Sequence, residues 1–201
     1  MEEIRHLYPV AQKVTEFCRS RGWKFCFIGG LALQRWGEPR KTVDVDLTLL
    51  TGFGNEEPFV DALLSEFTPR DPNAREFALK RRVVLLSLGK VGIDIALGGL
   101  PFEQNAIARS SDYLLASGLS VPTCSAEDLI VHKAFANRLQ DWADIQNVLI
   151  KQHLKLDFEL ILHELTPLVA LKEEPDILKQ LEQLRMDAER RVENAMKRFD
   201  L

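Results

Sequence analysis

The sequence predicts an α+β fold, with a small mixed, twisted sheet and flanking helices followed by a helical C-terminal part. Over residues 1–124, short apolar runs bounded by turn residues alternate with segments of helical apolar spacing. From residue 125 onward the apolar residues follow helical spacing. We therefore expect an α/β core at 1–124 and a helical part at 125–201. With 201 residues, 46% of them hydrophobic, the chain suits one domain of ordinary size with an appended helical part.

The elements of the core follow from the spacing of apolar residues and from the turn residues between them. Gly22 ends the first helix, Gly29-Gly30 separates the first strand from a short helix, and Gly89-Lys90 closes a hairpin. In chain order the predictions are a helix at 2–21, a strand at 23–28, a helix at 31–36, a strand at 43–50, a helix at 58–67, a turn-rich segment at 69–75, hairpin strands at 82–88 and 91–97, and one or two short strands within 112–122.

Three helices are predicted for the C-terminal part. Ser125 is a suitable N-cap and Asp128 an acid in the first turn, so a helix is expected to begin there and to run through Leu139. A second apolar-faced helix is expected at 157–171. The third, at 175–201, is long and charged with an apolar stripe, and its basic residues read as a solvated face or as contacts to an anionic acceptor.

Composition argues against several classes of protein. The net charge of −4 does not suit a broad basic surface for nucleic acid. The longest apolar runs are too short to span a membrane, and the N-terminus lacks the features of a signal peptide, so we expect a cytoplasmic protein without a membrane partner. Three widely spaced cysteines are typical of reduced thiols in that compartment.

Acidic residues in two predicted strands indicate a metal site. Asp44 and Asp46 alternate with apolar residues, so they lie on one face of a strand, where two carboxylates repel one another. Asp94 lies between two isoleucines in the second hairpin strand, where an aspartate is costly unless something pairs with it. A divalent cation offsets such paired negative charge, since hard cations prefer oxygen ligands.

Gly29-Gly30 lies at a strand-to-helix turn. Backbone amides at such a turn point outward, and glycine allows a phosphate to approach them closely. The alternative is an ordinary turn after a strand.

In order and spacing these motifs resemble the nucleotidyltransferase superfamily with the DNA polymerase beta fold. Its members carry a Gly-Gly or Gly-Ser turn, an acidic pair in the form D-x-D and a third acid between apolar residues. Here Gly29-Gly30 is followed after thirteen residues by Asp44-Val-Asp46, and later by Asp94. Many members have Ser at the position of Gly30, so this chain is expected to hold a phosphate by backbone amides alone.

Two longer runs resemble AbiEii-like toxins and antibiotic nucleotidyltransferases. One begins Arg40-Lys-Thr42 and continues into the acidic pair as R-x-T-x-D-x-D; the other has Lys133, a later arginine and a D-x-x-D-I run that starts at Asp141. The resemblance implies that Arg40 and Thr42 bind the nucleotide, that Lys133 contacts the triphosphate, and that Asp141 lies near the nucleotide or orients the lysine. Asp144 is expected to fix helix packing. The alternative for the second run is a solvated helix with a regular charge pattern.

The function that the resemblance implies is metal-dependent transfer of a nucleoside monophosphate from an NTP to a hydroxyl, with release of pyrophosphate. The acceptor is an RNA end, a protein or a small molecule, and an antitoxin-like partner is a further expectation. The expected catalytic and metal-binding residues are Asp44, Asp46 and Asp94, holding two Mg²⁺ ions, or Mn²⁺ in their place. The alternative is a non-catalytic nucleotide-binding or protein-interaction module that retains the fold.

Other polar residues have two readings each. Glu103 is either a helix-start acid or a polar group near the site, and His132 a surface or core residue. Five basic residues either contact the acceptor or belong to an ordinary surface: Arg70, Arg75, Lys80, Arg81 and Arg82.

Overall fold

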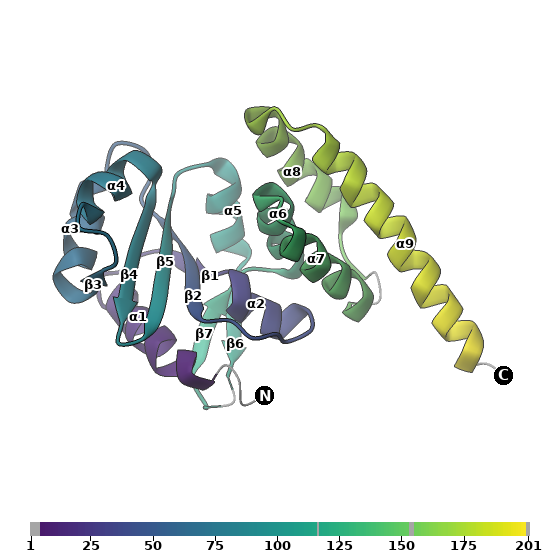
Figure 1. Ribbon diagram of the computed structural model, residues 1–201, viewed down its shortest axis with the longest axis horizontal. Helices are drawn as coiled ribbons and strands as arrows, with labels where there is room; N and C mark the ends of the chain where they lie inside the picture. Colours follow the sequence, from purple (N-terminus) through teal and green to yellow (C-terminus); the bar gives the residue numbers. More distant parts are fainter. Residues whose placement is uncertain (1–4, 116, 153–154, 200–201) are drawn as a thin grey trace. The chain divides into compact units, whose positions relative to one another are not determined.

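The computed structural model describes residues 5–115, 117–152 and 155–199, and the chain divides into two compact units (Figure 1). Residues 1–32 and 40–125 form the first, here called the sheet unit. Residues 33–39 and 126–201 form the second, the helical unit. The division falls within one helix, α2 (Gly29–Trp36), whose first residues belong to the sheet unit and whose last residues belong to the helical unit.

A seven-stranded mixed sheet forms the centre of the sheet unit, with strand order β3-β4-β5-β2-β1-β7-β6. The pairs β2–β5 and β1–β7 are parallel, and the other neighbouring pairs are antiparallel. The strands are β1 (Phe25–Phe27), β2 (Asp44–Leu50), β3 (Thr68–Pro69), β4 (Val83–Leu88), β5 (Val91–Gly98), β6 (Ser111–Leu114) and β7 (Ser120–Thr123). The predicted α+β fold is therefore confirmed, including the hairpin of β4 and β5.

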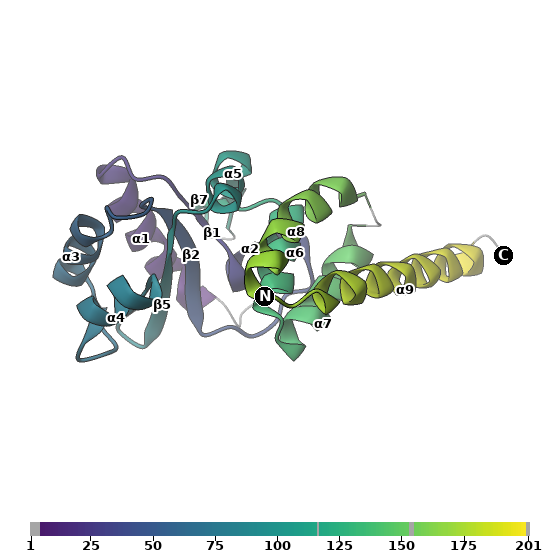
Figure 2. The same cartoon turned by 90° about the horizontal axis from the view of Figure 1, so that it is seen from above.

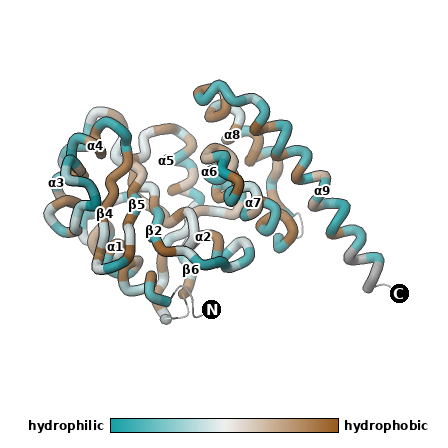
Figure 3. Tube along the Cα trace, in the orientation of Figure 1, coloured by the Kyte–Doolittle hydropathy of each residue, from teal (hydrophilic) through white to brown (hydrophobic). Residues whose placement is uncertain are grey.

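One face of this sheet is apolar and forms the core. Side chains alternate along a strand, so Val45, Leu47 and Leu49 of β2 point the same way, and all three are fully buried. They pack with apolar side chains of α1 (Tyr8–Ser20) and α3 (Glu57–Glu66). The strands β4 and β5 are largely hydrophobic in Figure 3. The same alternation places Asp44 and Asp46 on the opposite face, where both are partly exposed.

Two further helices of the sheet unit bear on the prediction. The helix α5 (Pro101–Arg109) lies against β1 and β2, and the Glu103 carboxylate accepts hydrogen bonds from the backbone N–H groups of Gly99 (2.7 Å) and Leu100 (2.8 Å). Glu103 is therefore the helix-start acid. The helix α4 (Ala74–Arg81) follows a segment predicted only as turn-rich, and only Ala74 and Ala78 are buried in it, so it has little apolar pattern to reveal it. The unit also contains a short 3-10 helix, η1 (Arg5–Leu7).

The helical unit contains α6 (Ala126–Ala136), α7 (Leu139–Lys151), α8 (Phe158–Lys172) and α9 (Asp176–Phe199). In Figures 1 and 2 the second half of α9 runs past the other helices of its unit. Its apolar stripe is buried at Ile177, Leu181 and Ala188, and its charged face contains i,i+3 and i,i+4 ion pairs such as Lys179–Asp176 (2.9 Å). The predicted helix ends at residues 2–4 and 200–201 lie outside the described residues.

The prediction of one helix from Ser125 through Leu139 was wrong. The helix α6 ends before Asn137, whose φ of 58° lies in the left-handed region that asparagine tolerates better than most residues. The Asn137 side chain also accepts a hydrogen bond from the indole N–H of Trp142 (2.8 Å) and donates one to Glu174 (2.9 Å). The turn between α6 and α7 is thus fixed by side-chain contacts from both sides. Within the described residues, none of the helices combines the length and apolar character needed to cross a bilayer.

Candidate active site

The three predicted acids lie on one face of two neighbouring parallel strands. In the register of β2 and β5, Asp46 is the direct partner of Asp94, and Asp44 is the partner of Gly92. Paired residues of adjacent strands point to the same face, about 4.8 Å apart along the direction of the backbone hydrogen bonds. The strand pairing therefore brings Asp46 beside Asp94, with Asp44 two residues earlier on the same face.

Two glycines leave room for these carboxylates. A Cβ atom at Gly29 would lie 2.2 Å from Oδ2 of Asp46, and one at Gly92 would lie 2.1 Å from Oδ1 of Asp44. Gly29 also has φ of +53°, which disfavours any residue with a side chain. The turn is attached to β2 by the Ile28 N–H, which donates to the Asp46 carbonyl at 3.0 Å. The first glycine of the predicted phosphate turn thus packs directly against an acid of the pair.

Gly30, where related proteins often have Ser, packs against Thr42. A Cβ at Gly30 would lie 2.7 Å from both Oγ1 and Cγ2 of Thr42. The threonine of the R-x-T-x-D-x-D run therefore fills the space that a side chain at position 30 would need. Arg40 lies in the same loop, and its guanidinium donates to the Lys41 carbonyl (3.3 Å).

Asp94 is held by Arg70, the residue that follows β3. The Arg70 guanidinium forms an ion pair and a hydrogen bond with the Asp94 carboxylate, and both side chains are about one-third exposed (34% and 35%). Burial raises the pKa of Asp94 and the neighbouring Asp44 carboxylate raises it further, while Arg70 acts in the opposite direction; the net pKa is above its usual value. Asp94 thus holds a proton more readily than an ordinary aspartate does.

The donor atoms suit a hard divalent cation. Asp44 and Asp46 present carboxylate oxygens on one face, and the absence of side chains at Gly29 and Gly92 gives these carboxylates their room. Within the described part of the chain no three His, Cys, Asp or Glu side chains already converge at metal-ligand spacing. Asp94 is turned to Arg70 instead. The pair Asp44–Asp46 therefore fits a divalent ion, and Asp94, paired with Arg70, is the third carboxylate on this face.

The second predicted motif forms a buried ionic cluster in the helical unit. Lys133 of α6 is 5% exposed, and its Nζ lies 2.6 Å from Oδ2 of Asp144 and 3.3 Å from Oδ1 of Asp141, both on α7. Arg138 donates to the other oxygen of Asp141 (2.7 Å), and Gln140 to the other oxygen of Asp144 (3.1 Å). A solvated charged helix is excluded, because both aspartates are 2% exposed or less.

The candidate residues therefore fall into two sets. In the sheet unit, one turn and one sheet face bring together Gly29, Gly30, Thr42, Asp44, Asp46 and Asp94. Arg40 lies in the loop before Thr42, with its guanidinium on the Lys41 carbonyl. Lys133 and Asp141 belong to the helical unit. Of the five basic residues named from the sequence, Arg75 pairs with Glu57 and Asp61, and Arg82 pairs with Glu56.

Sequence reasoning missed the parts played by Gly92 and Arg70. A glycine two residues before a strand aspartate was a usable signal for the first, since Gly in a strand interior often marks a close approach. Arg70 had no local signal for its contact with Asp94, because the sequence does not give the register of β3 on β4.

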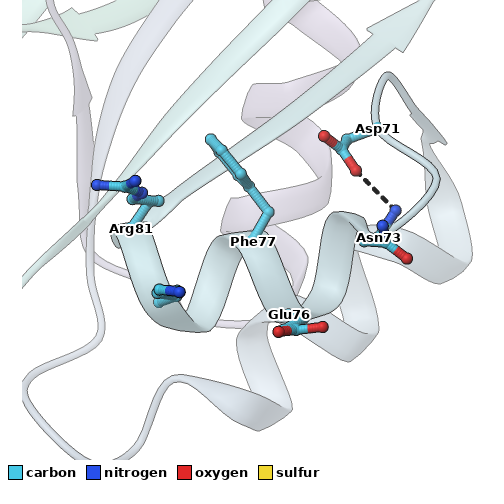
Figure 4. A pocket seen from close by; sticks show the side chains of 6 residues that line it. Asp71, Asn73, Glu76, Phe77 and Arg81 are labelled. Carbon is cyan, nitrogen blue, oxygen red and sulfur yellow. Dashed lines mark hydrogen bonds between the residues drawn. The ribbon is translucent and has the colours of Figure 1, made fainter.

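A separate hollow of about 270 Å³ lies at α4 (Figure 4). The Asp71 carboxylate accepts from the Asn73 backbone N–H at its mouth (2.7 Å), and Phe77 and Arg81 line it from the helix. The candidate acids are not among its lining residues.

Three solved structures are similar to this chain to different degrees. An antigenic nucleotidyltransferase-like protein from Paracoccidioides brasiliensis is 16% identical, with a TM-score of 0.51 over 88% of this chain and 92% of that one. The lincosamide antibiotic adenylyltransferase LnuA is 13% identical, with a TM-score of 0.47 over 68% of this chain and 92% of its own. ANT(2")-Ia is 17% identical, with a TM-score of 0.42 over 89% and 97%. At such identities the first likeness shows the fold alone, and the other two are too distant for a conclusion.

Comparison of the sequence with individual curated proteins found no significant match. Comparison with models of protein families did find one. The family model described as "Nucleotidyl transferase AbiEii toxin, Type IV TA system" matches residues 20–198, which include both the acidic strands and the Lys133 cluster. With nearly the whole chain matched, this protein belongs to the AbiEii nucleotidyltransferase family of toxins of type IV toxin–antitoxin systems.

Proposed function

We propose that this nucleotidyltransferase acts with bound divalent metal, transferring a nucleoside monophosphate from an NTP to a hydroxyl and releasing pyrophosphate. The observation that carries the proposal is the register of β2 and β5, which puts Asp46 beside Asp94 and leaves Asp44 opposite a glycine. An oxygen-only donor set of this kind suits Mg²⁺ or Mn²⁺. When bound, such ions neutralise charge on the phosphates and lower the pKa of an attacking hydroxyl.

The residues of the sheet unit then have separate roles. Asp44, Asp46 and Asp94 would hold the metal, and Asp94 would also accept the proton of the attacking hydroxyl. Burial and the neighbouring Asp44 carboxylate raise the pKa of Asp94, which makes it a better proton acceptor than an ordinary aspartate. Gly29 and Gly30 open α2, and the first N–H groups of a helix have no acceptor within the helix, so they are suited to bind phosphate oxygens.

We also propose that Lys133 serves the nucleotide and that Asp141 orients it, as the family resemblance implies. The second half of this proposal is supported by the contacts of the lysine. Two carboxylates fix its ammonium at 2.6 and 3.3 Å, and Arg138 in turn holds Asp141. A charge held in this way loses little conformational entropy when it meets a phosphate.

Label transfer tests the reaction. The protein is incubated with Mg²⁺ and each α-³²P NTP in a whole-cell extract, beside a double variant, Asp44→Asn with Asp46→Asn. The surface variant Asp61→Asn, which removes an exposed carboxylate of α3 in the same unit, serves as the matched control. Label is expected with the wild type and with Asp61→Asn but not with the double variant. The labelled fraction identifies the acceptor as RNA, protein or small molecule.

The opposite result would favour another function. If nucleotide binds and stabilises the protein but no fraction is labelled under any condition, the chain is a nucleotide-binding module without turnover. The family description also names a toxin–antitoxin system, so we propose an antitoxin-like partner encoded with this protein. Growth inhibition by the chain alone, relieved by co-expression of that partner, tests this.

A further inference from the structure

Arg70 belongs to one row of residues that crosses the sheet. Its backbone N–H donates to the Leu85 carbonyl (3.0 Å), Leu85 is the register partner of Asp94, and Asp94 is the partner of Asp46. Residues paired in this way point to the same face. The arginine is therefore anchored by its backbone in the row of the two acids, with its side chain directed along it.

The guanidinium lies beside Gly92 as well as against Asp94. It pairs with Asp94, and its Nη1 lies 3.0 Å from where a Cβ of Gly92 would stand, a point that is itself 2.1 Å from Oδ1 of Asp44. The missing side chain at Gly92 thus leaves space that the Asp44 carboxylate and the Arg70 guanidinium share. Arg70 supplies positive charge at the place where the proposed function requires a divalent ion.

Two other arginines of the sheet unit pair with acids outside the candidate site. Arg75 is held by Glu57 and Asp61, and Arg82 by Glu56 and by the carbonyls of Gly52 and Leu97. Among these three arginines, only Arg70 pairs with one of the site's acids.

We infer that Arg70 is a built-in counter-cation that competes with the divalent metal for Asp94 and so sets the metal affinity of the site. With Arg70 on Asp94, repulsion among the acids is relieved and the metal-free protein is stabilised. When metal binds, Asp94 exchanges the guanidinium for the ion, and part of the binding energy is used to break the ion pair. This inference rests on the metal dependence proposed above.

The test measures metal binding and not turnover. Calorimetric titration with Mn²⁺ alone compares the wild type with Arg70→Ala at the same pH and ionic strength. Arg75→Ala is the matched control, because it removes an arginine with two carboxylate partners outside the site. A thermal melt with and without Mn²⁺ is recorded for each protein.

Arg70→Ala is expected to bind Mn²⁺ about threefold to tenfold more tightly, since a unit charge a few ångströms from a divalent ion at a partly exposed site repels it by an amount of this order. Its melting temperature is expected to be lower than that of the wild type without metal and to rise more when Mn²⁺ is added. Arg75→Ala should bind Mn²⁺ like the wild type.

Two other results overturn the inference in distinguishable ways. Equal or weaker binding by Arg70→Ala, with clear binding by the wild type, rejects the competition and leaves the metal-dependent function standing. If neither protein binds Mn²⁺, and NTP does not restore binding, the metal dependence itself fails.

Discussion

The packing of Gly92 against Asp44 leads to a quantitative prediction for Gly92→Ala. In an unobstructed strand this substitution would stabilise the protein by about 0.5–1 kcal/mol, because glycine loses more backbone entropy on folding than alanine does. Here the new methyl group would lie 2.1 Å from Oδ1 of Asp44 and 3.0 Å from its Cγ, so the whole carboxylate has to move. Arg70 is met only at Nη1, at 3.0 Å, the end of a flexible side chain that can turn away.

The expected magnitude has two parts. Overpacking of this kind costs about 1–3 kcal/mol, so after the backbone gain Gly92→Ala should destabilise the protein by about 1–2 kcal/mol. Displacement of a catalytic group by about 1 Å lowers the rate on the order of 100-fold. Activity should therefore fall far more than stability does.

A double-mutant cycle measured by urea denaturation isolates the cause. In an Asp44→Ala background the methyl group meets no carboxylate, so Gly92→Ala should be neutral or stabilise by about 0.5–1 kcal/mol. The coupling between the two sites is then about 2 kcal/mol, within the range of residues in direct contact. An equal loss of stability in both backgrounds would refute the reasoning, since Asp44 could not then be what excludes a side chain at position 92.

Three further predictions concern buried groups. Lys133→Met removes the ammonium that two buried carboxylates share, with Arg138 still paired to Asp141, and should destabilise the protein by about 3 kcal/mol in urea denaturation. Lys179→Met, which breaks an exposed pair, should change stability by less than about 0.5 kcal/mol. Burial raises the pKa of Cys18 to about 12 and all three cysteines are buried, so a thiol reagent should label the native protein only as fast as it opens; rapid labelling at pH 8 would contradict this. Burial lowers the pKa of His132 to about 4. Between about pH 6.5 and 4 the unfolded chain therefore binds a proton that the folded chain does not. The free energy of unfolding should fall as the pH falls through this range, by about 2 kcal/mol from pH 7 to 5. His132→Asn should reduce that slope; an unchanged slope would assign it to other groups.

The sequence was most informative where a local period carries the information. Alternation along 43–50 placed Asp44 and Asp46 on the face away from Val45 and Leu47, and the structure has them there. The hairpin of β4 and β5 followed from its turn residues in the same way. The periodicity of apolar residues does not determine which strands become neighbours in the sheet. The pairing of Asp46 with Asp94 depends on a parallel contact between β2 and β5 that is set by the packing of the whole unit.

Positions that depend on a distant partner were not predicted. The use of Gly92 follows from Asp44, and the orientation of Arg70 follows from Asp94, each on another strand. Gly30 was noted as a departure from the family pattern, but its reason, the side chain of Thr42, appears only when the loop is folded back onto α2. In each case the role of a residue depends on a side chain that is distant in the sequence and close in the fold.

The break at Asn137 changes the meaning of the second motif. On one continuous helix Lys133 would be eight and eleven residues from Asp141 and Asp144, and the charges would form a row along a surface. Because α6 ends at Ala136, the lysine and the two aspartates come from different helices and meet in the interior between α6 and α7. Burial of an ammonium with two carboxylates is costly unless every charge is paired, which explains why Arg138 and Gln140 hold the outer oxygens. Removal of one charge of the cluster would leave another buried without its full set of partners, so the cluster couples α6 to α7 whatever the lysine binds.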